Sequence, residues 1–356
     1  MTACYQMDPA TSGSYGSYYN TRTQTYYAPT TDYFLSVATT HAGANYPCPL
    51  DGPKTEKGTY QIAASFCTPK QKNGKEKIII LATHGIGPVR AHWNSPYKPE
   101  DYNFVQWAIG QEYSVFFYDR LGNGASQKIS SYTGQINTAI AVVQELAKLV
   151  RNGKYTGNIK KPNKVALMGF SFGSYTTHGA ISLTPEIADA IILTAIGFNK
   201  TGLNVNGLVR SFVPQIVNQQ NPAVFGDRDN RYLTWVDKFA HIHNYFKKPN
   251  YEEATVDFAE AAKNPFSIGE FLTLLSGPQD ASKFDKPVLH ITGDVDYIFC
   301  DGYCYGIFEE PAKTIYSSAK PLQLSLHPGA SHHINLHKNA TGAFKVITDF
   351  LSNNGL

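Results

Sequence analysis

The feature that most limits the fold is a series of short, continuous apolar runs. Four of them, IIILA, VFFY, VALM and VLHI, begin at Ile78, Val115, Val165 and Val288. Continuous runs of this length, as opposed to alternating ones, are typical of strands buried on both faces of a parallel sheet. Apolar runs bounded by Gly, Pro or Asp predict strands at Tyr60–Cys67, Lys77–Thr83, Ser114–Tyr118, Lys164–Met168, Ala188–Ala195, Pro287–Thr292 and Leu322–Leu326.

The segments between these strands have the period of amphipathic helices. Apolar residues recur at spacings of four and three within residues 136–150, and Gly153 is placed to end that helix. Ala340, Phe344, Ile347 and Leu351 repeat the pattern near the end of the chain. Strands that alternate with helices predict an α/β protein with a mostly parallel sheet and flanking helices.

Composition narrows the class of protein further. Of the 356 residues, 42% are hydrophobic and 17% are charged, so the chain can bury a core and is not intrinsically disordered. The net charge is +3 with no basic stripe, which argues against a nucleic-acid partner. No stretch approaches the roughly 18 to 20 apolar residues of a membrane span. We expect a small-molecule partner, and the oligomeric state stays open.

Residues 199–285 break the strand–helix alternation. Ser267 and Glu270 form a capping box before an apolar run, so a helix is predicted there. A helical insertion between two sheet strands is most simply a cap over the carboxyl edge of the sheet, where ligands of open α/β sheets bind. The expected organisation is a partly irregular N-terminal arm at 1–57, a core at 58–198, a helical cap at 199–285 and the rest of the core at 286–356.

One motif places a serine at a strand-to-helix turn. Gly169–Gly173, with the sequence GFSFG, directly follows the predicted strand that ends at Met168, and a helical run follows it. A nucleophilic serine must project from such a sharp turn, and flanking glycines leave room for it. Ser171 is therefore the candidate nucleophile.

A second turn supplies the candidate donors to an oxyanion. Thr83–Gly87, with the sequence THGIG, follows an early strand, where the second oxyanion donor is expected. We expect the backbone amides of Phe172 and Ile86 to act as the donors, with Gly87 as the other candidate for the second. His84 is expected to hold the loop by hydrogen bonding.

A candidate acid and a candidate base follow the last two predicted strands. Asp296 is preferred over Asp294, because the residue beside the glycine usually closes the turn. His332 is preferred over His333, because it directly follows the Gly-Ala-Ser turn. A histidine that reaches the serine hydroxyl takes its proton, and an aspartate orients the imidazole.

Neither a metal nor a cofactor is expected. His327, His333 and His337 cluster in the sequence, but no cysteine or carboxylate near them completes a ligand set. Asp119 and Arg120, in the motif YDRLGNGAS, are interpreted as a structural ion pair beside a tight turn.

The compartment is predicted from weaker signals. Low charge with many tyrosines is common on secreted surfaces, although no apolar segment follows Met1. We expect a secreted protein whose signal peptide is absent from this sequence, with a cytoplasmic location as the alternative. Of the five cysteines, Cys300 and Cys304 could bridge locally, and the pairing stays open.

Taken in order, these motifs resemble those of the α/β-hydrolase superfamily. The final GASHHINLHKNA, together with Phe66–Pro69 and Trp93, resembles its fungal branch of serine hydrolases, of the AB hydrolase-1 type. The resemblance implies an eight-stranded, mostly parallel sheet with a cap. It also implies a catalytic triad of Ser171, Asp296 and His332.

The expected activity is that of a serine hydrolase, most simply a carboxylic ester hydrolase. It would cleave an ester or lactone of a hydrophobic or aromatic small molecule through an acyl-enzyme. Trp93, Phe170 and Trp235 are the candidates for binding that substrate. The alternative is a non-hydrolytic enzyme of the same fold, a cyclase, lyase or acyltransferase of fungal secondary metabolism.

Overall fold

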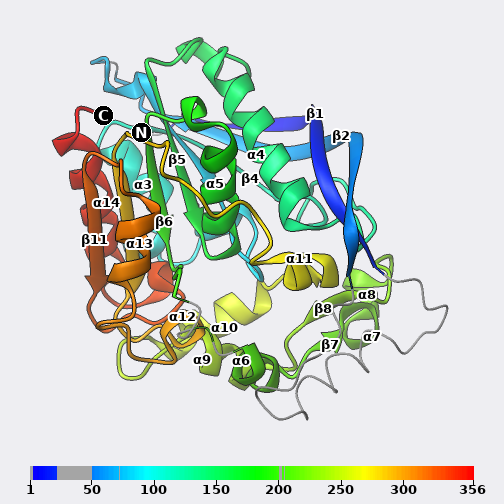
Figure 1. Cartoon of the computed structure of the whole chain (residues 1–356). Helices are drawn as coiled ribbons and strands as arrows, with labels where there is room; N and C mark the ends of the chain where they lie inside the picture. The colour runs from blue at the N-terminus through cyan, green and yellow to red at the C-terminus, as the bar shows by residue number, and fades with distance from the viewer. Residues whose placement is uncertain (1–2, 22–49, 72, 200–202, 204) are drawn as a thin grey trace.

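The computed structural model describes residues 3–21, 50–71, 73–199, 203 and 205–356. Within them, eight strands form the main sheet in the order β1-β2-β4-β3-β5-β6-β10-β11 (Figure 1). β2 runs antiparallel to both of its neighbours, and the other neighbouring strands are parallel. The strands are β1 (Ala3–Thr21), β2 (Leu50–Thr68), β3 (Ile78–Thr83), β4 (Ser114–Tyr118), β5 (Lys164–Phe170), β6 (Ala190–Thr194), β10 (Val288–Gly293) and β11 (Leu322–His327).

The sheet confirms the expected α/β-hydrolase fold. Every residue of β4, β6 and β10 is buried, as continuous apolar runs predict. The seven strands predicted from the pattern correspond to β2–β6, β10 and β11.

Helices cover both faces of the sheet. Figure 1 shows α4 (Ile136–Arg151) and α5 (Phe172–Leu183) on one face, and α3 (Phe104–Gly110) and α14 (Ala340–Asn353) together on the other. The predicted stripe of α4 is buried, and Gly153 follows its end at φ +78°, a conformation that favours glycine. The remaining short elements of the core are α2 (Pro99–Tyr102), α12 (Tyr297–Cys300), α13 (Glu309–Ile315) and 3₁₀ turns at Lys75–Lys77, Arg90–His92, Gly157–Ile159, Pro185–Ile187 and Ile334–Leu336.

The first strand was not predicted. β1 pairs with β2 in a long antiparallel ribbon that bends away from the sheet toward the insertion (Figure 1). The boundary expected at residue 57 therefore falls inside β2. Residues 22–49 of the expected N-terminal arm lie outside the described residues.

The insertion differs from the expected all-helical cap. Besides its helices, its described part contains a three-stranded antiparallel sheet in the order β7-β8-β9. Strands of two or three residues are too short to leave a periodic signal. The elements are α6 (Val205–Phe212), β7 (Gln215–Ile216), α7 (Val217–Gln220), α8 (Pro222–Phe225), β8 (Tyr232–Thr234), α9 (Lys238–Tyr245), α10 (Glu253–Ala261), β9 (Phe266–Ser267) and α11 (Ile268–Thr273).

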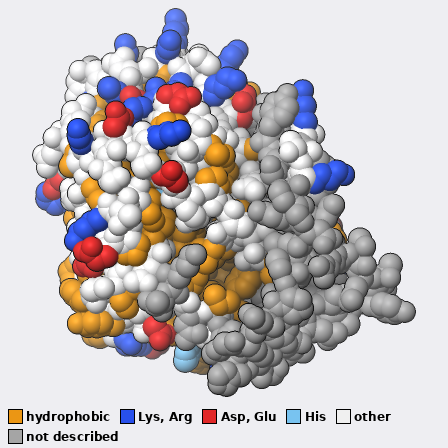
Figure 2. All heavy atoms as spheres, viewed as in Figure 1, with side chains coloured by type: hydrophobic (Ala, Val, Ile, Leu, Met, Phe, Trp, Pro, Cys, Tyr) orange, Lys and Arg blue, Asp and Glu red, His pale blue; other side chains and the backbone are white. Residues whose placement is uncertain are grey.

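The predicted capping box is confirmed. Ser267 accepts from the amide of Glu270, and Glu270 accepts from the amide of Ser267, at the start of α11. No helix in the described ranges has the length and apolar character that crossing a bilayer requires. Figure 2 shows hydrophobic side chains gathered over the middle and lower part of one face.

Candidate active site

Ser171 sits at the turn between β5 and α5. Its backbone has φ 53° and ψ −119°, a conformation that non-glycine residues seldom adopt and that costs on the order of 1–3 kcal/mol. A Cβ on Gly169 would lie 2.4 Å from the backbone of Ser174, and one on Gly173 would lie 2.2 Å from the carbonyl oxygen of Thr83. The two glycines of the motif are therefore required by close backbone approach.

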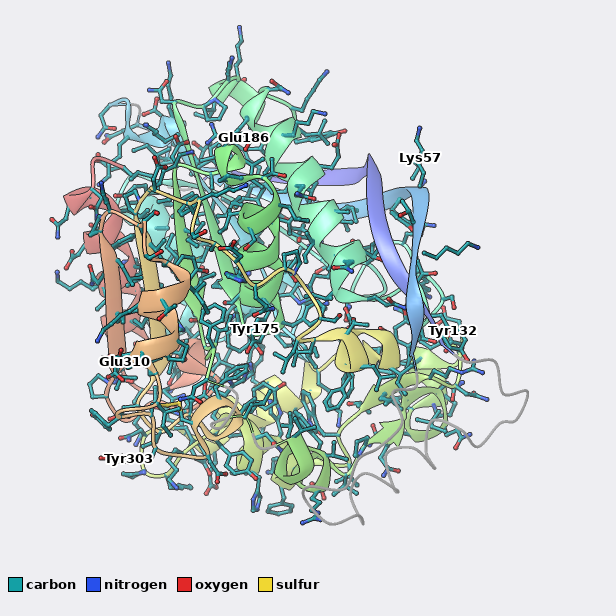
Figure 3. All side chains as sticks on the ribbon, viewed as in Figure 1. Lys57, Tyr132, Tyr175, Glu186, Tyr303 and Glu310 are labelled. Carbon is teal, nitrogen blue, oxygen red and sulfur yellow. A yellow bond between two sulfur atoms is a disulfide. The ribbon has the colours of Figure 1, made fainter. Side chains whose placement is uncertain are left out.

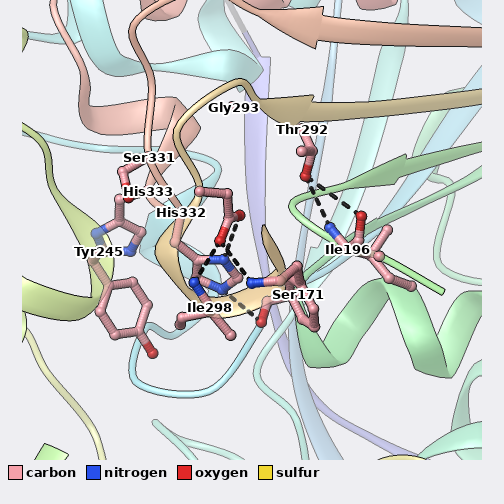
Figure 4. A network of polar contacts seen from close by, with 12 residues as sticks. Ser171, Ile196, Tyr245, Thr292, Gly293, Ile298, Ser331, His332 and His333 are labelled. Carbon is pink, nitrogen blue, oxygen red and sulfur yellow. Dashed lines mark hydrogen bonds and ion pairs between the residues drawn. The ribbon is translucent and has the colours of Figure 1, made fainter. Parts of the chain in front are cut away.

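Three side chains from separate segments form a hydrogen-bonded series. His332 Nε2 lies 2.8 Å from Ser171 Oγ, and His332 Nδ1 lies 2.8 Å from Asp296 Oδ2 (Figure 4). His332 and Asp296 are fully buried, and Ser171 is 9% exposed. The structure thus brings together the serine, the histidine and the aspartate that the sequence singled out.

Backbone donors fix the carboxylate of Asp296. Its Oδ1 accepts from the amide of Ile298 at 2.8 Å and from that of Phe299 at 3.2 Å, at the start of α12. Oδ2 is thereby directed at His332. Hydrogen bonds to a carboxylate stabilise its charged form, which in turn stabilises an imidazolium beside it.

Asp294 and His333, the alternatives to Asp296 and His332, lie outside the hydrogen-bonded series. Asp294 accepts from the amide of Gly329 at 2.7 Å and from the hydroxyl of Tyr305 at 3.1 Å, so it holds neighbouring loops. His333 has no hydrogen bond to Ser171; its ring stacks on Phe170 and lies beside Tyr245 (Figure 4).

The loop Thr83–Gly87 passes directly beside Ser171. A Cβ on Gly85 would lie 2.9 Å from Ser171 Cβ. The amide of Phe172 begins α5 and so has no acceptor within the helix. The carbonyl of Ile86 accepts from the hydroxyl of Tyr245 at 3.0 Å, which ties this loop to the insertion at residues 199–285.

His84 holds the loop by hydrogen bonding, as expected. Its Nδ1 donates to the carbonyl of Gly85 at 2.9 Å, and its Nε2 accepts from the amide of Arg120 at 3.0 Å. Burial, together with the positive charge of Arg120, lowers the pKa of His84 well below its ordinary value. The imidazole is therefore neutral at pH 7, which suits one donating and one accepting nitrogen.

The expected ion pair between Asp119 and Arg120 is not formed. Asp119 instead pairs with Arg90 and accepts from the amide of Ala125. Arg120 forms a buried ion pair with Glu270 of α11, and its Nη2 donates to the carbonyl of Gly85 at 3.0 Å. Sequence reasoning missed this link because its partners lie 150 residues apart.

The candidate substrate-binding residues divide into two groups. Trp235 lines a pocket that is partly open to solvent; its empty volume of about 450 Å³ includes open solvent. Trp93 and Phe170 are fully buried and do not line this pocket. His92, His241 and Phe258 also line this pocket, and the sequence did not mark them as binding residues. No motif in residues 199–285 would have marked His241 or Phe258.

No group of three or more His, Cys, Asp or Glu side chains in the described ranges is placed to hold a metal ion. His327 and His337 serve the loop around His332 instead. His327 contacts the carbonyl of Asn339, and His337 accepts from the amide of Ser331.

Comparison with known proteins agrees with the fold. The model of the alpha/beta hydrolase family matches residues 79–341. No curated protein matches the chain. Similar solved structures include a monoacylglycerol lipase from Paleococcus ferrophilus, with a TM-score of 0.54 and 14% identity over 82% of this chain and 99% of that one.

Two further structures share the fold at similarly low identity. A thermophilic esterase from Thermogutta terrifontis has a TM-score of 0.52 and 16% identity over 83% of this chain and 94% of that one. The alpha/beta hydrolase GrgF from Penicillium sp. sh18 has a TM-score of 0.52 and 15% identity over the same shares. Because the family model spans most of the 356 residues, the chain belongs to the alpha/beta hydrolase family.

Proposed function

We propose that the protein is a serine hydrolase that cleaves an ester or lactone of a hydrophobic or aromatic small molecule. The observation that carries this proposal is the series Ser171–His332–Asp296, with 2.8 Å at both of its links. A hydroxyl, an imidazole and a carboxylate in this order make the hydroxyl a nucleophile, because the imidazole accepts its proton and the carboxylate stabilises the imidazolium.

The reaction proceeds through an acyl-enzyme. Ser171 Oγ attacks the carbonyl carbon and its proton passes to His332 Nε2. The imidazolium then gives this proton to the departing alcohol oxygen. Water attacks the acyl-enzyme, with His332 again accepting the proton, and the acid leaves as Ser171 regains its hydrogen. The amides of Phe172 and Ile86 are the proposed donors to the oxyanion, with Gly87 as the other candidate for the second.

The lining of the pocket supports a hydrophobic substrate. Trp235, Phe258 and Leu336 contribute apolar surface, whereas the described lining contains no carboxylate, lysine or arginine. Ligand pockets of this kind bind the apolar part of a molecule, and a few polar groups orient it.

The test is hydrolysis of a panel of p-nitrophenyl esters with acyl chains of increasing length. Ser171→Ala is expected to lower kcat at least ~10³-fold. Ser317→Ala serves as the control, because Ser317 is exposed and lies outside the site. Ester hydrolysis that persists in Ser171→Ala would remove the serine from the mechanism.

We also infer that the protein is secreted. Cys300 and Cys304 form a disulfide, and Cys67 is disulfide-bonded as well. Disulfides persist mainly in oxidising compartments. Thiol titration of protein taken from its natural source is expected to find these three cysteines oxidised, and reduced cysteines would contradict secretion.

A further inference from the structure

Two histidines that line the same pocket as Trp235 have buried ring nitrogens without a hydrogen-bond partner. The pocket adjoins the site, because Gly87 of the oxyanion loop and His333, the neighbour of His332, both line it. Ser171, His332 and Asp296 are not among its lining residues. The pocket is therefore a space beside the reacting atoms, and the proposed hydrolysis assigns it no polar partner.

Two of its histidines have ring nitrogens without a hydrogen bond. Neither Nδ1 nor Nε2 of His333 has a partner, and His333 is 3% exposed. Nε2 of His241 also has none, and His241 is 1% exposed. A buried nitrogen without a hydrogen bond costs about 1–3 kcal/mol, which a bound ligand could offset. Rotation about χ2, a broad torsion in histidine, can turn a ring nitrogen of His333, which no hydrogen bond fixes, toward the ligand.

The contacts of His241 define what its free nitrogen needs. Its Nδ1 donates to Glu260 Oε2 at 3.0 Å, and the same carboxylate accepts from Trp235 Nε1 at 2.7 Å. Burial alone would raise the pKa of Glu260, but hydrogen bonds from His241, Lys263 and Trp235 lower it to about 2. Because the proton of the neutral imidazole is on Nδ1, Nε2 is a lone-pair acceptor and requires a donor from the ligand.

The second histidine can both donate and accept. Burial lowers the pKa of His333 well below its ordinary value, and the nearby rings of His241 and His92 add to the effect. His333 is therefore neutral at pH 7 and presents one N–H and one lone pair. The ring centroids of His241 and His333 lie 5.5 Å apart, a separation at which one hydroxyl group can contact both rings.

We propose that this pocket is a subsite that selects a substrate whose apolar part carries a neutral hydroxyl group. The hydroxyl donates to His241 Nε2 and accepts from the N–H of His333, while Trp235 and Phe258 contact the apolar part. A carboxylate in its place would meet the lone pair of His241 and the charge of Glu260. The inference deepens the proposed ester hydrolysis and rests on it for the statement that the ligand is a substrate.

The test compares two probes that differ only in whether they carry a hydroxyl group that can donate a hydrogen bond. Calorimetry measures the binding of 4-propylphenol and of its methyl ether, 4-propylanisole, to the wild-type protein. The phenol is expected to bind at least ~10-fold more tightly, because a site built around a hydroxyl rejects the analogue that lacks one. Equal affinities, or binding of neither probe, would overturn the proposal. Equal affinities would result, for example, if His241 and His333 hydrogen-bonded to each other and left no nitrogen for the hydroxyl group.

Substitutions of the two histidines test whether these residues cause the preference for the phenol. His241→Phe is expected to abolish the preference for the phenol, whereas His243→Phe, at an exposed position of the same helix α9, keeps it. If His241→Phe does not fold, His333→Phe takes its place, with the same expected loss. A preference that survives both substitutions would contradict the assignment of the hydroxyl to these rings.

The binding assay needs no turnover, so the two proposals fail separately. Absence of a phenol preference in a protein whose esterase activity depends on Ser171 overturns the subsite alone. A phenol preference that depends on His241, in a protein without Ser171-dependent hydrolysis, overturns the proposed reaction and leaves the binding site.

Discussion

Asp296 is held by two backbone amides and a histidine, and this arrangement assigns it a single task. Its Oδ2 reaches His332 Nδ1, while Oδ1 is fixed by the amides of Ile298 and Phe299. The carboxylate therefore selects the tautomer that leaves Nε2 free to accept the proton of Ser171. Geometry alone separates Asp296 from Asp294, which lies two residues away and contacts Gly329 and Tyr305.

Replacing Asp296 by Asn tests this orientation. The amide is isosteric and can still contact His332, but its NH₂ group favours the tautomer whose proton sits on Nε2. We expect kcat for ester hydrolysis to fall on the order of 10³–10⁴-fold, with thermal stability little changed. Asp294→Asn is the matched comparison, and a similar loss of kcat there would contradict the separate roles of the two carboxylates.

The residues of the core site were predictable because each follows a strong local pattern. Ser171, Asp296 and His332 each follow an apolar strand and a turn rich in glycine. His241 and Phe258 were not predicted as binding residues, because the helices α9 and α10 have no motif and reach the site only through tertiary packing. Trp93 and Phe170 are fully buried and do not line the pocket beside the site, so their contact with a substrate stays a prediction.

Among the elements, a buried ion pair contributes to the link between the core and α11. Arg120 contacts Glu270 of α11, the carbonyl of Gly85 and, at 4.5 Å, the ring of Phe172. Burial raises the pKa of Glu270, and the charge of Arg120 opposes that rise. Removing one partner of a buried pair is strongly destabilising, because the remaining charge stays buried without compensation.

Glu270→Gln isolates the charge, because glutamine can preserve the capping box with Ser267. We expect the free energy of unfolding, measured in urea, to fall by about 2–4 kcal/mol, together with a lower kcat. Glu310→Gln is the control: Glu310 pairs with Lys313 at the surface, its side chain is 77% exposed, and Figure 3 shows it on the outside. We expect its loss to cost under ~1 kcal/mol. Equal effects of the two substitutions would contradict the role of Arg120.

Element prediction succeeded where a period extends over several turns or a buried strand. The stripe of α4 and the seven predicted strands belong to this class. β1 was missed because its polar, tyrosine-rich sequence has no apolar period, and its pairing with residues 50–68 joins distant parts of the chain. The strands β7, β8 and β9 are too short for any pattern.

Across the molecule, buried histidines couple folding to pH. Burial is the main cause that lowers the pKa of eight histidines. The pKa falls to about 3 for His92 and to about 4 for His178, His290 and His337. The same direction of shift is found for His84, His241, His327 and His333. Their pKa in the unfolded chain is about 6.5. The unfolded state therefore takes up protons first as the pH falls.

The direction in which stability changes with pH follows from these lowered pKa values. The stability that these groups contribute is complete above pH ~6.5 and is lost as the pH falls from there toward the folded-state values near 4. We expect Tm to fall by at least ~5 °C between pH 7.5 and pH 5. Scanning calorimetry checks this, and a Tm that is unchanged or higher at pH 5 would show that these histidines are charged or exposed in the folded protein.

The identity of the nucleophile is the central claim of the proposed mechanism. The ester panel already compares Ser171→Ala with wild type; peptide mass spectrometry after reaction with a fluorophosphonate locates the labelled atom. We expect one adduct per chain, on the peptide that contains Ser171, and none in Ser171→Ala. Label on another residue, or a wild-type protein that stays unlabelled while it hydrolyses esters, would contradict the Ser171–His332–Asp296 mechanism.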